Sequence, residues 1–534
     1  MARDETAVPP REVELKLELD PADLQTLLAH PLLAGGDEPA AILRSVYYDT
    51  PDGRLAEAGC SLRVRATGDG FVQTVKADAG AAAGLFDRPE WEAPVAGPRP
   101  SGRALRGTPA AKALGRGGAK ALRPLFTTVM ERTKRRVSRD GTVASLTVDS
   151  GRVEDGSGRV LPLCEVELEL ERGPPDALFD LARDLGTVAA LRPGTRSKSE
   201  RGRALVAGTL GAVAKAGPVA LPPDATAATG FQAIARACLG HLALNEAAFL
   251  GERRPEALHQ TRVALRRLRA ALHLFRAVVA DEAVEGLKAE LTRLAEPLGR
   301  ARNLDVFLSE TLPAEIERRP DEPGLPDLLR RVEAERARAT DAVAAVLTGA
   351  EWRRFLLDLV AWIEAGPWLR TEGRAADERE APLAEFGAEA LAGLRRKVAR
   401  RGRRLAGLDP HARHRVRIGA KRLRYAAEFL EAAYPARKAR RRRAAFVEAL
   451  SALQDELGAL NDIATGHALA EELVASLPPE PRGRGRRGEA GPMPSQTLFA
   501  AGIVAADVDG RAAAHLERAE AAHRDFRRAK RFWR

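Results

Sequence analysis

The spacing of apolar residues changes near residue 207, and this change constrains the fold more than any other feature of the chain. Up to that point short runs alternate apolar and polar residues, as in REVELKLEL, CSLRVRA and VLPLCEVELELERG. Such alternation between turns is typical of antiparallel strands. From about residue 231 the spacing becomes helical, as in ALHQTRVALRRLRAALHLF. Because 534 residues exceed one ordinary core, we expect an α+β protein with at least two domains.

A stretch with small residues and Pro, little charge and no strong period joins the two patterns at residues 206–230. We interpret it as a linker. The sequence therefore predicts an N-terminal domain over residues 1–207, a linker over 208–225 and a helical domain over 226–534. Within the helical domain, the Pro-, Gly- and Arg-rich stretch at about 478–495 is predicted to be a disordered loop.

Charge is distributed unevenly along the chain. Residues 1–200 hold 28 Lys and Arg against 30 Asp and Glu, whereas residues 201–534 hold 57 against 44. The basic excess of the second part favours an anionic partner, although a solvated basic surface has the same composition. Three widely separated cysteines indicate neither a disulfide framework nor a thiolate zinc site. The sequence has neither an apolar signal core nor a membrane-length apolar run, so we expect a cytoplasmic protein.

Several predicted strands are acidic on one side. Glu12, Glu14 and Lys16 share one face of their strand, and Glu165 and Glu167 share one face of another. Any single strand of this kind also fits an ordinary sheet with its charges in water. If the charged faces line a barrel lumen, closely spaced carboxylates favour divalent metal binding, and neighbouring Arg and Lys side chains suit a polyanionic phosphate.

The E-x-E-x-K strand, the YYDT, LRVR and RPEWE segments, the D-x-G turn, the CEVELEL strand and the RSKSERGRAL end together resemble the CYTH family, also called triphosphate tunnel metalloenzymes. The resemblance covers roughly residues 10–207. It implies an eight-stranded antiparallel β-barrel tunnel with flanking helices. It also implies acidic positions at or near bound metal, namely Glu12, Glu14, Glu90, Glu92, Asp149, Glu165 and Glu167, with Glu169 as a further candidate.

The same resemblance implies a set of cations that hold the triphosphate and support catalysis: Lys16, Arg63, Arg65, Lys76, Arg132 and Lys198, with Arg88 and Arg135 as looser candidates. The implied reaction is hydrolysis of the terminal phosphate of tripolyphosphate with Mg²⁺ or Mn²⁺. By family analogy, one metal orients the phosphates and a second activates the attacking water. Adenylate cyclisation and thiamine or nucleoside triphosphate hydrolysis remain alternatives, as does a barrel that binds phosphate chains without cleaving them.

A basic motif occurs twice in the helical part. His259-x-x-Arg262-x-x-x-Arg266-Arg267-Leu268-Arg269 recurs 155 residues later as His414-x-x-Arg417-x-x-x-Lys421-Arg422-Leu423-Arg424. On a helix the spacing places cations in one stripe, which His273 and Arg276 continue in the first copy. Stacked like charges repel, and a bound polyanion offsets that repulsion. We therefore expect an internally duplicated all-α helical bundle in which two basic helices line one groove.

The two motif segments resemble the signature helices of CHAD domains, a helical family that binds inorganic polyphosphate and frequently follows CYTH domains. The resemblance covers roughly residues 226–534 and implies polyphosphate binding by His259, Arg262, Arg266, Arg269, His414, Arg417, Lys421 and Arg424. It makes inorganic triphosphate and polyphosphate the expected partners and polyphosphate granules a further expected location. Aromatic residues make up only 4% of the chain, so nucleic acid is not expected. We expect Asn303, Asp305, Asn461 and Asp462 to form helix caps or inter-helix hydrogen bonds.

Overall fold

The computed structural model describes residues 11–33, 40–77, 83–475, 494–510 and 512–533. The chain divides into two compact units. Unit 1 consists of Met1–Val213, Ala235–Ala248 and Thr348–Arg370, and unit 2 consists of Ala214–Ile234, Phe249–Leu347 and Thr371–Arg534. The domain limits given by the sequence stay a prediction. Among the described residues, no helix combines the length and apolarity needed to cross a bilayer.

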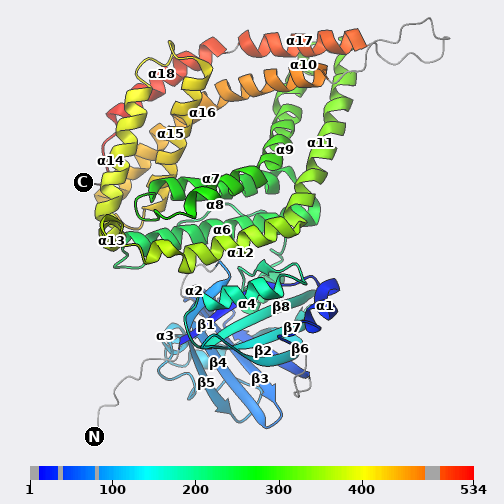
Figure 1. Ribbon diagram of the computed structural model, residues 1–534, viewed down its shortest axis with the longest axis vertical. Coiled ribbons are helices and arrows are strands. Elements are labelled where there is room, and N and C mark those ends of the chain that lie inside the picture. Colours follow the sequence, from blue (N-terminus) through cyan, green and yellow to red (C-terminus); the bar gives the residue numbers. More distant parts are fainter. Residues whose placement is uncertain (1–10, 34–39, 78–82, 476–493, 511, 534) are drawn as a thin grey trace, which may run out of the picture. The chain divides into compact units, whose positions relative to one another are not determined.

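Unit 1 is built around a closed antiparallel barrel of eight strands (Figure 1). The order around the barrel is β5-β4-β3-β2-β6-β7-β8-β1, and pairing of β1 with β5 closes it. This architecture confirms the predicted fold class. The strands are β1 (Arg11–Glu18), β2 (Ala41–Asp49), β3 (Cys60–Thr67), β4 (Gly70–Ala77), β5 (Leu85–Val95), β6 (Arg123–Arg139), β7 (Thr142–Asp155) and β8 (Val160–Arg172), and the short β9 (Arg192–Pro193) pairs with β1.

Two features of the barrel differ from the sequence analysis. The longest strand, β6, was not among the alternating runs, because its second half is a dense series of Lys and Arg. Gly151, which we expected in a D-x-G turn, lies inside β7 and pairs with Met130. A Cβ at Gly151 would lie 2.1 Å from the Val129 carbonyl oxygen. Glycine is therefore needed there for the close approach of two strands and not for a turn.

Apolar side chains pack on the outside of the barrel, because its inside is charged. Leu62, Val64 and Val75 of β3 and β4 form one buried cluster with Leu55 and Leu114. Leu55 and Leu114 belong to the short helices α2 (Arg54–Glu57) and α3 (Pro109–Leu114).

The YYDT segment positions α2. The buried Asp49 carboxylate accepts hydrogen bonds from the backbone amides of Thr50, Leu55 and Ala56. Asp49 therefore has a structural role at the start of α2 and is not a lumen residue.

Helix α5 (Lys198–Ala207) closes one end of the barrel. It begins with a capping box between Ser197 and Glu200. Its Leu205 belongs to a buried cluster with residues that occupy the lumen-facing positions of the strands, Tyr47, Phe126, Met130, Val153 and Leu163. A Cβ at Gly202 would lie 2.2 Å from the Phe126 ring, so only glycine permits this approach. The lumen is therefore apolar and packed at one end. Helices α1 (Leu24–Leu28) and α4 (Ala177–Leu185) complete this part of the chain.

The described residues beyond 226 are mainly helical, with η3 as a π-helix and η4 as a 3-10 helix. Its elements are α6 (Ala227–Glu252), α7 (Pro255–Leu274), α8 (Val284–Leu294), α9 (Glu296–Val306), η3 (Phe307–Thr311), α10 (Leu312–Arg318), α11 (Leu325–Thr348), α12 (Ala350–Ala365), η4 (Pro367–Leu369), α13 (Arg374–Glu380), α14 (Leu383–Arg401), α15 (Pro410–Phe429), α16 (Arg437–Ala475), α17 (Pro494–Gly510) and α18 (Ala512–Arg528).

The predicted duplication is present in the structure. Helices α7 and α15 both begin with Pro, both contain 20 residues, and their bounds differ by the same 155 residues as the motifs. The two helices pack against each other. The predicted loop at 478–495 lies outside the described residues up to position 493, and α17 begins at Pro494.

Candidate active site

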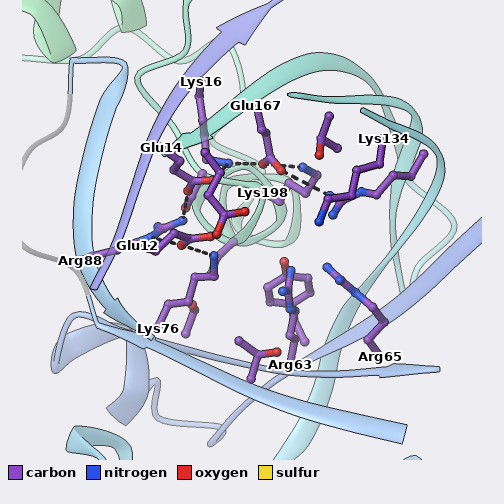
Figure 2. A pocket seen from close by; sticks show the side chains of 18 residues that line it. Glu12, Glu14, Lys16, Arg63, Arg65, Lys76, Arg88, Lys134, Glu167 and Lys198 are labelled. Atoms are coloured by element: carbon purple, nitrogen blue, oxygen red, sulfur yellow. Dashed lines mark hydrogen bonds and ion pairs between the residues drawn. The ribbon is translucent and has the colours of Figure 1, made fainter. Parts of the chain in front are cut away.

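The charged faces of the strands line a cavity of about 80 Å³ inside the barrel. Figure 2 shows acidic side chains and Lys16 gathered on one side and Arg63 and Arg65 on the other. The barrel thus brings together nine of the predicted residues as lining, namely Glu12, Glu14, Lys16, Arg63, Arg65, Lys76, Arg132, Glu167 and Lys198, and the further candidates Arg88 and Glu169 line the cavity as well. They come from β1, β3, β4, β5, β6, β8 and the first residue of α5.

A cluster of three carboxylates, Asp149, Glu165 and Glu167, has its ligand oxygens within 4.8 Å of one another. Of the three, Glu167 lines the cavity, and Asp149 and Glu165 are buried behind the lining. Lys198 forms ion pairs with all three, at 2.8 Å from Asp149 and 3.0 Å from Glu167. Arg132 donates two hydrogen bonds to Asp149. Burial disfavours the Lys198 ammonium, but the three carboxylates outweigh burial and raise its pKa well above the ordinary value.

The carboxylates of this cluster differ in their preference for a proton. Burial raises the pKa of Glu165, an effect that its ion pairs do not overcome. Burial acts on Glu167 in the same direction, but Lys16 and Lys198 hold its pKa well below the ordinary value. The cluster therefore carries anionic charge only because ammonium groups lie within it.

A second group of ion pairs continues toward β4 and β5. Arg88 binds Glu14 at 2.6 Å, and Lys76 bridges Glu12 at 2.5 Å and Glu90 at 3.2 Å. Lys16 lies 3.2 Å from Glu14 and also pairs with Glu167, which links the two groups. Glu12, Glu14 and Glu90 thus each have a cationic partner, whereas Glu169 on the same wall forms no ion pair within the described residues.

The opposite wall carries cations with few carboxylate partners. Arg63 lies 3.8 Å from Glu90 and 3.9 Å from Glu92. Arg65 donates a hydrogen bond to the Ser45 hydroxyl at 3.2 Å, and it has no ion pair with a carboxylate of the described residues. Burial, together with Arg63 and Arg132, lowers the pKa of Arg65 to about 10. This wall has unmatched positive charge directed into the lumen.

Exposure increases along the lumen away from α5. The side chain of Asp149 is 0% exposed and that of Glu167 is 13% exposed, whereas that of Glu92 is 53% exposed. Lys134 and Glu169 are also exposed. Burial and two neighbouring carboxylates, Glu12 and Glu14, raise the pKa of Glu169. The lumen consequently opens at the end away from α5.

The structure adds residues to the predicted set and places others outside it. Tyr47, Lys134 and Ser197 line the cavity although we did not predict them. Burial would raise the pKa of the Tyr47 phenol, but Arg63 and Lys198 lower it on balance. Arg135, a looser candidate, donates to the Leu33 carbonyl and does not line the cavity. Strand parity could have indicated Tyr47, because it lies two residues from Ser45 in an alternating strand and therefore faces the same side.

The all-oxygen donor set of Asp149, Glu165 and Glu167 suits a hard divalent cation. The cluster is buried, and its three carboxylates are close enough for one cation to contact an oxygen of each. A metal there competes with the Lys198 ammonium, which now neutralises the same oxygens. Glu90 and Glu92 lie on β5, where they pair with Lys76 and Arg63, and are not part of this cluster.

The two basic stripes of unit 2 meet where α7 packs on α15. Arg266 of α7 lies close enough to lower the pKa of Arg417 and of Lys421 on α15, and burial is the larger cause in both cases. The pKa of Lys421 falls to about 7. Several buried donors in the stripes have no hydrogen-bond partner among the described residues: Nε of Arg262, Arg266, Arg269 and Arg417, and Nδ1 of His259.

Two of the remaining stripe residues, His414 and Arg424, have partners. His414 Nδ1 lies 2.7 Å from the Asn461 side-chain oxygen, and Arg424 donates to Gln454 at 3.1 Å and pairs with Glu428 at 3.4 Å. Asp305 accepts from Arg336 of α11 at 2.7 Å. Hydrogen bonds within the bundle thus involve Asp305 and Asn461, whereas the unmatched donors concentrate on α7 and at Arg417.

A closed antiparallel barrel with a charged lumen, followed by a duplicated helical unit with paired basic helices, defines a class of two-part proteins with two cation-rich sites. The comparisons with known families agree with this class. Residues 10–202 match the CYTH domain and residues 233–471 match the CHAD domain. The chain is therefore a CYTH domain followed by a CHAD domain.

Individual relatives cover parts of the chain. An inorganic triphosphatase of Haemophilus influenzae is 29% identical over 196 residues, which are 36% of this chain and 54% of that protein, so the chain spans about half the length of this curated relative. The solved CHAD domain of the plant Ricinus communis is 30% identical, with a TM-score of 0.48, over 59% of this chain and 96% of that one. A putative adenylyl cyclase from Hippeastrum, described as having a dominant triphosphatase activity, is 19% identical, with a TM-score of 0.28, over 37% and 97%.

Proposed function

We propose that the barrel is a divalent-metal-dependent inorganic triphosphatase that hydrolyses the terminal phosphate of tripolyphosphate. The observation that carries this proposal is the presence, in one lumen, of a buried carboxylate cluster and of an arginine wall in which Arg65 has no carboxylate partner among the described residues. The similarity of this part of the chain to an inorganic triphosphatase supports the proposed substrate.

The residues of the lumen have distinct tasks in this proposal. Arg63 and Arg65 bind phosphate oxygens, because Arg65 forms no ion pair within the described residues and the carboxylates nearest to Arg63 lie 3.8 Å and 3.9 Å away. Asp149, Glu165 and Glu167 hold Mg²⁺ or Mn²⁺, with Glu12 and Glu14 next to them. A bound divalent ion supplies Lewis-acid neutralisation of phosphate charge and lowers the pKa of a coordinated water. Lys198 and Lys16 then move from carboxylate oxygens toward the phosphates, which keeps the lumen close to neutral.

The deciding experiment is a phosphate-release screen with purified protein and Mg²⁺ or Mn²⁺ over tripolyphosphate, long polyphosphate, ATP and thiamine triphosphate. We expect tripolyphosphate to be the best substrate and EDTA to abolish turnover. Glu14→Gln is expected to lower kcat by at least tenfold, because it removes a carboxylate that pairs with Lys16 and Arg88. Glu131→Gln is the matched control, since Glu131 is exposed and lies outside the lumen lining.

The same screen separates the alternatives. Release of pyrophosphate and cyclic AMP from ATP identifies an adenylate cyclase, and preferential release of phosphate from thiamine triphosphate or nucleotides identifies those hydrolases. Tripolyphosphate binding without metal-dependent turnover in the wild type, unchanged in Glu14→Gln, establishes a phosphate-binding barrel that does not cleave its ligand.

We also propose that the paired stripes of α7 and α15 bind inorganic polyphosphate. The buried donors of His259, Arg262, Arg266, Arg269 and Arg417 support this proposal, because an unpaired buried donor is costly and phosphate oxygens are suited to satisfy it. Lys421 adds a cation at the same place, and His414 and Arg424 extend the stripe with groups that other side chains already hold.

Binding of long-chain polyphosphate at several salt concentrations tests the stripes. Arg266→Ala with Arg417→Ala is expected to weaken binding at least tenfold and to reduce the slope of log affinity against log salt, because fewer counterions are released. Arg374→Ala with Arg528→Ala makes the same charge change at exposed positions of unit 2 and serves as the control. An unchanged slope in the stripe variant contradicts the proposal.

A further inference from the structure

The duplication in unit 2 is broken at one ion pair. In the first copy, Arg267 of α7 binds Glu428 of α15 at 2.6 Å. The 155-residue offset relates Arg267 to Arg422 and Glu428 to His273. This second pair also meets, with Arg422 Nη1 3.5 Å from His273 Nε2. An imidazole therefore stands where the duplicated geometry has a carboxylate, and Arg422 lacks the anionic partner that Arg267 has.

A basic cavity of about 90 Å³ lies beside this pair, between α7, α14 and α15. We call it the α14–α15 pocket. Arg422 and His273 are half-buried in it, and Lys397, Arg401 and Arg415 are exposed around it. None of its lining residues is acidic, and none of these five forms an ion pair with a carboxylate of the described residues. The remaining lining is Leu394, Val398, Val416 and Gly419.

On α15 the pocket is separate from the stripe, whereas on α7 it includes His273, which continues the stripe of the first copy. At 100° per residue, Arg415 and Arg422 lie roughly 140° to 160° around the helix from Arg417. Arg417 and Lys421 face Arg266, whereas Arg415 and Arg422 face α14. Gly419 of α15 allows α14 to approach closely, because a Cβ at this position would lie 3.2 Å from the Val398 side chain. A phosphate chain bound to Arg417 and Lys421 therefore lies on a different side of α15 from this pocket.

The cationic side chains of the pocket repel one another, and no acidic residue of the lining neutralises them. Burial, with Arg422, Arg276 and Lys397, lowers the pKa of His273 to about 4. Burial and Arg401 lower the pKa of Arg422. Like charges held this close destabilise the fold unless an anion joins them. The cavity is larger than the roughly 30 Å³ that one water occupies, so a tetrahedral oxyanion has room.

We propose that the α14–α15 pocket binds a phosphoryl group as an oxyanion, with Arg422 as its principal ligand and with the exposed cations Lys397, Arg401 and Arg415 closing over it. The ligand stands in for the carboxylate that Glu428 supplies to Arg267. Guanidinium groups suit this chemistry because their N–H fork matches two oxygens of a phosphoryl group. The phosphoryl group is either free orthophosphate or the end of a polyphosphate chain, which present the same oxygens.

The test is calorimetric titration of the full chain, in EDTA, with orthophosphate and separately with tripolyphosphate. The decisive variant is His273→Glu, which rebuilds the ion pair of the first copy in the second. We expect it to lose at least tenfold in orthophosphate affinity and to melt at the same or a higher temperature than the wild type. Arg422→Gln is a second variant, expected to lose binding in the same way without adding a carboxylate.

The two titrations distinguish the sources of the ligand. If free phosphate is the ligand, only the orthophosphate affinity falls in His273→Glu. If the end of a chain is the ligand, the tripolyphosphate affinity falls as well, and by more. Arg266→Ala with Arg417→Ala is expected to retain orthophosphate binding, so failure of the stripe proposal and failure of this one are distinguishable. Absence of saturable orthophosphate binding to the wild type, or equal affinity in His273→Glu, overturns the proposal.

Discussion

Among single residues, Arg132 and Arg65 show how two arginines of one lumen differ in what they stabilise. Arg132 holds the fully buried Asp149 with two hydrogen bonds, whereas Arg65 donates only to Ser45 and is repelled by Arg63. The structural cost of removing a cation depends on the buried charge it leaves behind and not on its own burial.

We predict that Arg132→Ala lowers the free energy of unfolding by about 1.5 to 3 kcal/mol, the usual value of hydrogen bonds to a charged group. Arg65→Ala is expected to lower it by less than about 1 kcal/mol, because one neutral acceptor is lost and repulsion is relieved. Both variants are expected to raise KM for tripolyphosphate. Urea unfolding with steady-state kinetics measures both effects, and equal destabilisation by the two variants contradicts this account.

Lys421 is a residue whose charge depends on pH in the physiological range. Burial and the cations Arg417 and Arg266 lower its pKa from 10.5 to about 7. The unfolded chain therefore binds more protons than the folded chain between about pH 7 and pH 10.5, so the contribution of Lys421 to stability increases with pH across that window. A bound polyanion favours the ammonium and reverses this tendency.

We predict that polyphosphate binding takes up protons near pH 7 to 8 and that affinity falls as pH rises from 6 to 9. Titration calorimetry in buffers of different ionisation enthalpy measures the uptake. Lys421→Arg keeps its charge across this range and is expected to flatten the pH profile. A profile that is equally steep in Lys421→Arg assigns the pH dependence to another group.

At the level of residues, the sequence alone predicted on which face of a strand a side chain lies, because alternate residues share a face. Glu12, Glu14 and Lys16 face one way because alternate residues of a strand must. The partners of these groups were not accessible to this reasoning. That Lys198 joins Asp149 to Glu165, or that Arg88 pairs with Glu14, depends on which strands are neighbours, and the closure of β1 on β5 sets that order.

Among the elements, α5 has two roles, because it carries Lys198 at its first residue and closes the lumen with Leu205. The position of the lysine therefore depends on packing about two turns further along the helix. The RSKSERGRAL segment predicts neither the capping box nor the approach to Phe126, since both depend on contacts with other strands.

We predict that Gly202→Ala destabilises unit 1 by about 1 to 3 kcal/mol, the usual cost of overpacking, and lowers turnover by displacing Lys198. The ideal Cβ at this position lies 2.2 Å from the Phe126 ring, which leaves no room for adjustment. Gly68→Ala, in the turn between β3 and β4, has no atom within 4 Å of its Cβ and is the control. Thermal unfolding and kcat are the measurements. If Gly202→Ala is as stable as Gly68→Ala, the close packing of Gly202 against Phe126 is contradicted.

For the whole chain, the two units carry separate cation-rich sites, and each ligand is expected to protect the unit that binds it. At a concentration one hundred times the dissociation constant, a ligand stabilises the folded state by about 2.7 kcal/mol. We predict that long-chain polyphosphate raises the unfolding temperature of unit 2 and still does so in Glu14→Gln. Calorimetry of the full chain measures this, and loss of the protection in Glu14→Gln shows that the lumen is its source.

The packed end of the barrel has a consequence for polymers. Among the described residues one end of the lumen is packed and the other is exposed, so a chain that enters by the exposed end enters by its terminus, and the cleaved product leaves by the same end. For the proposed phosphohydrolase, this geometry excludes threading and excludes scission at internal bonds, so degradation of a long chain is distributive and proceeds one end unit at a time. A polyphosphate esterified at both termini with bulky groups is then an inert polymer, however tightly the helical unit holds it.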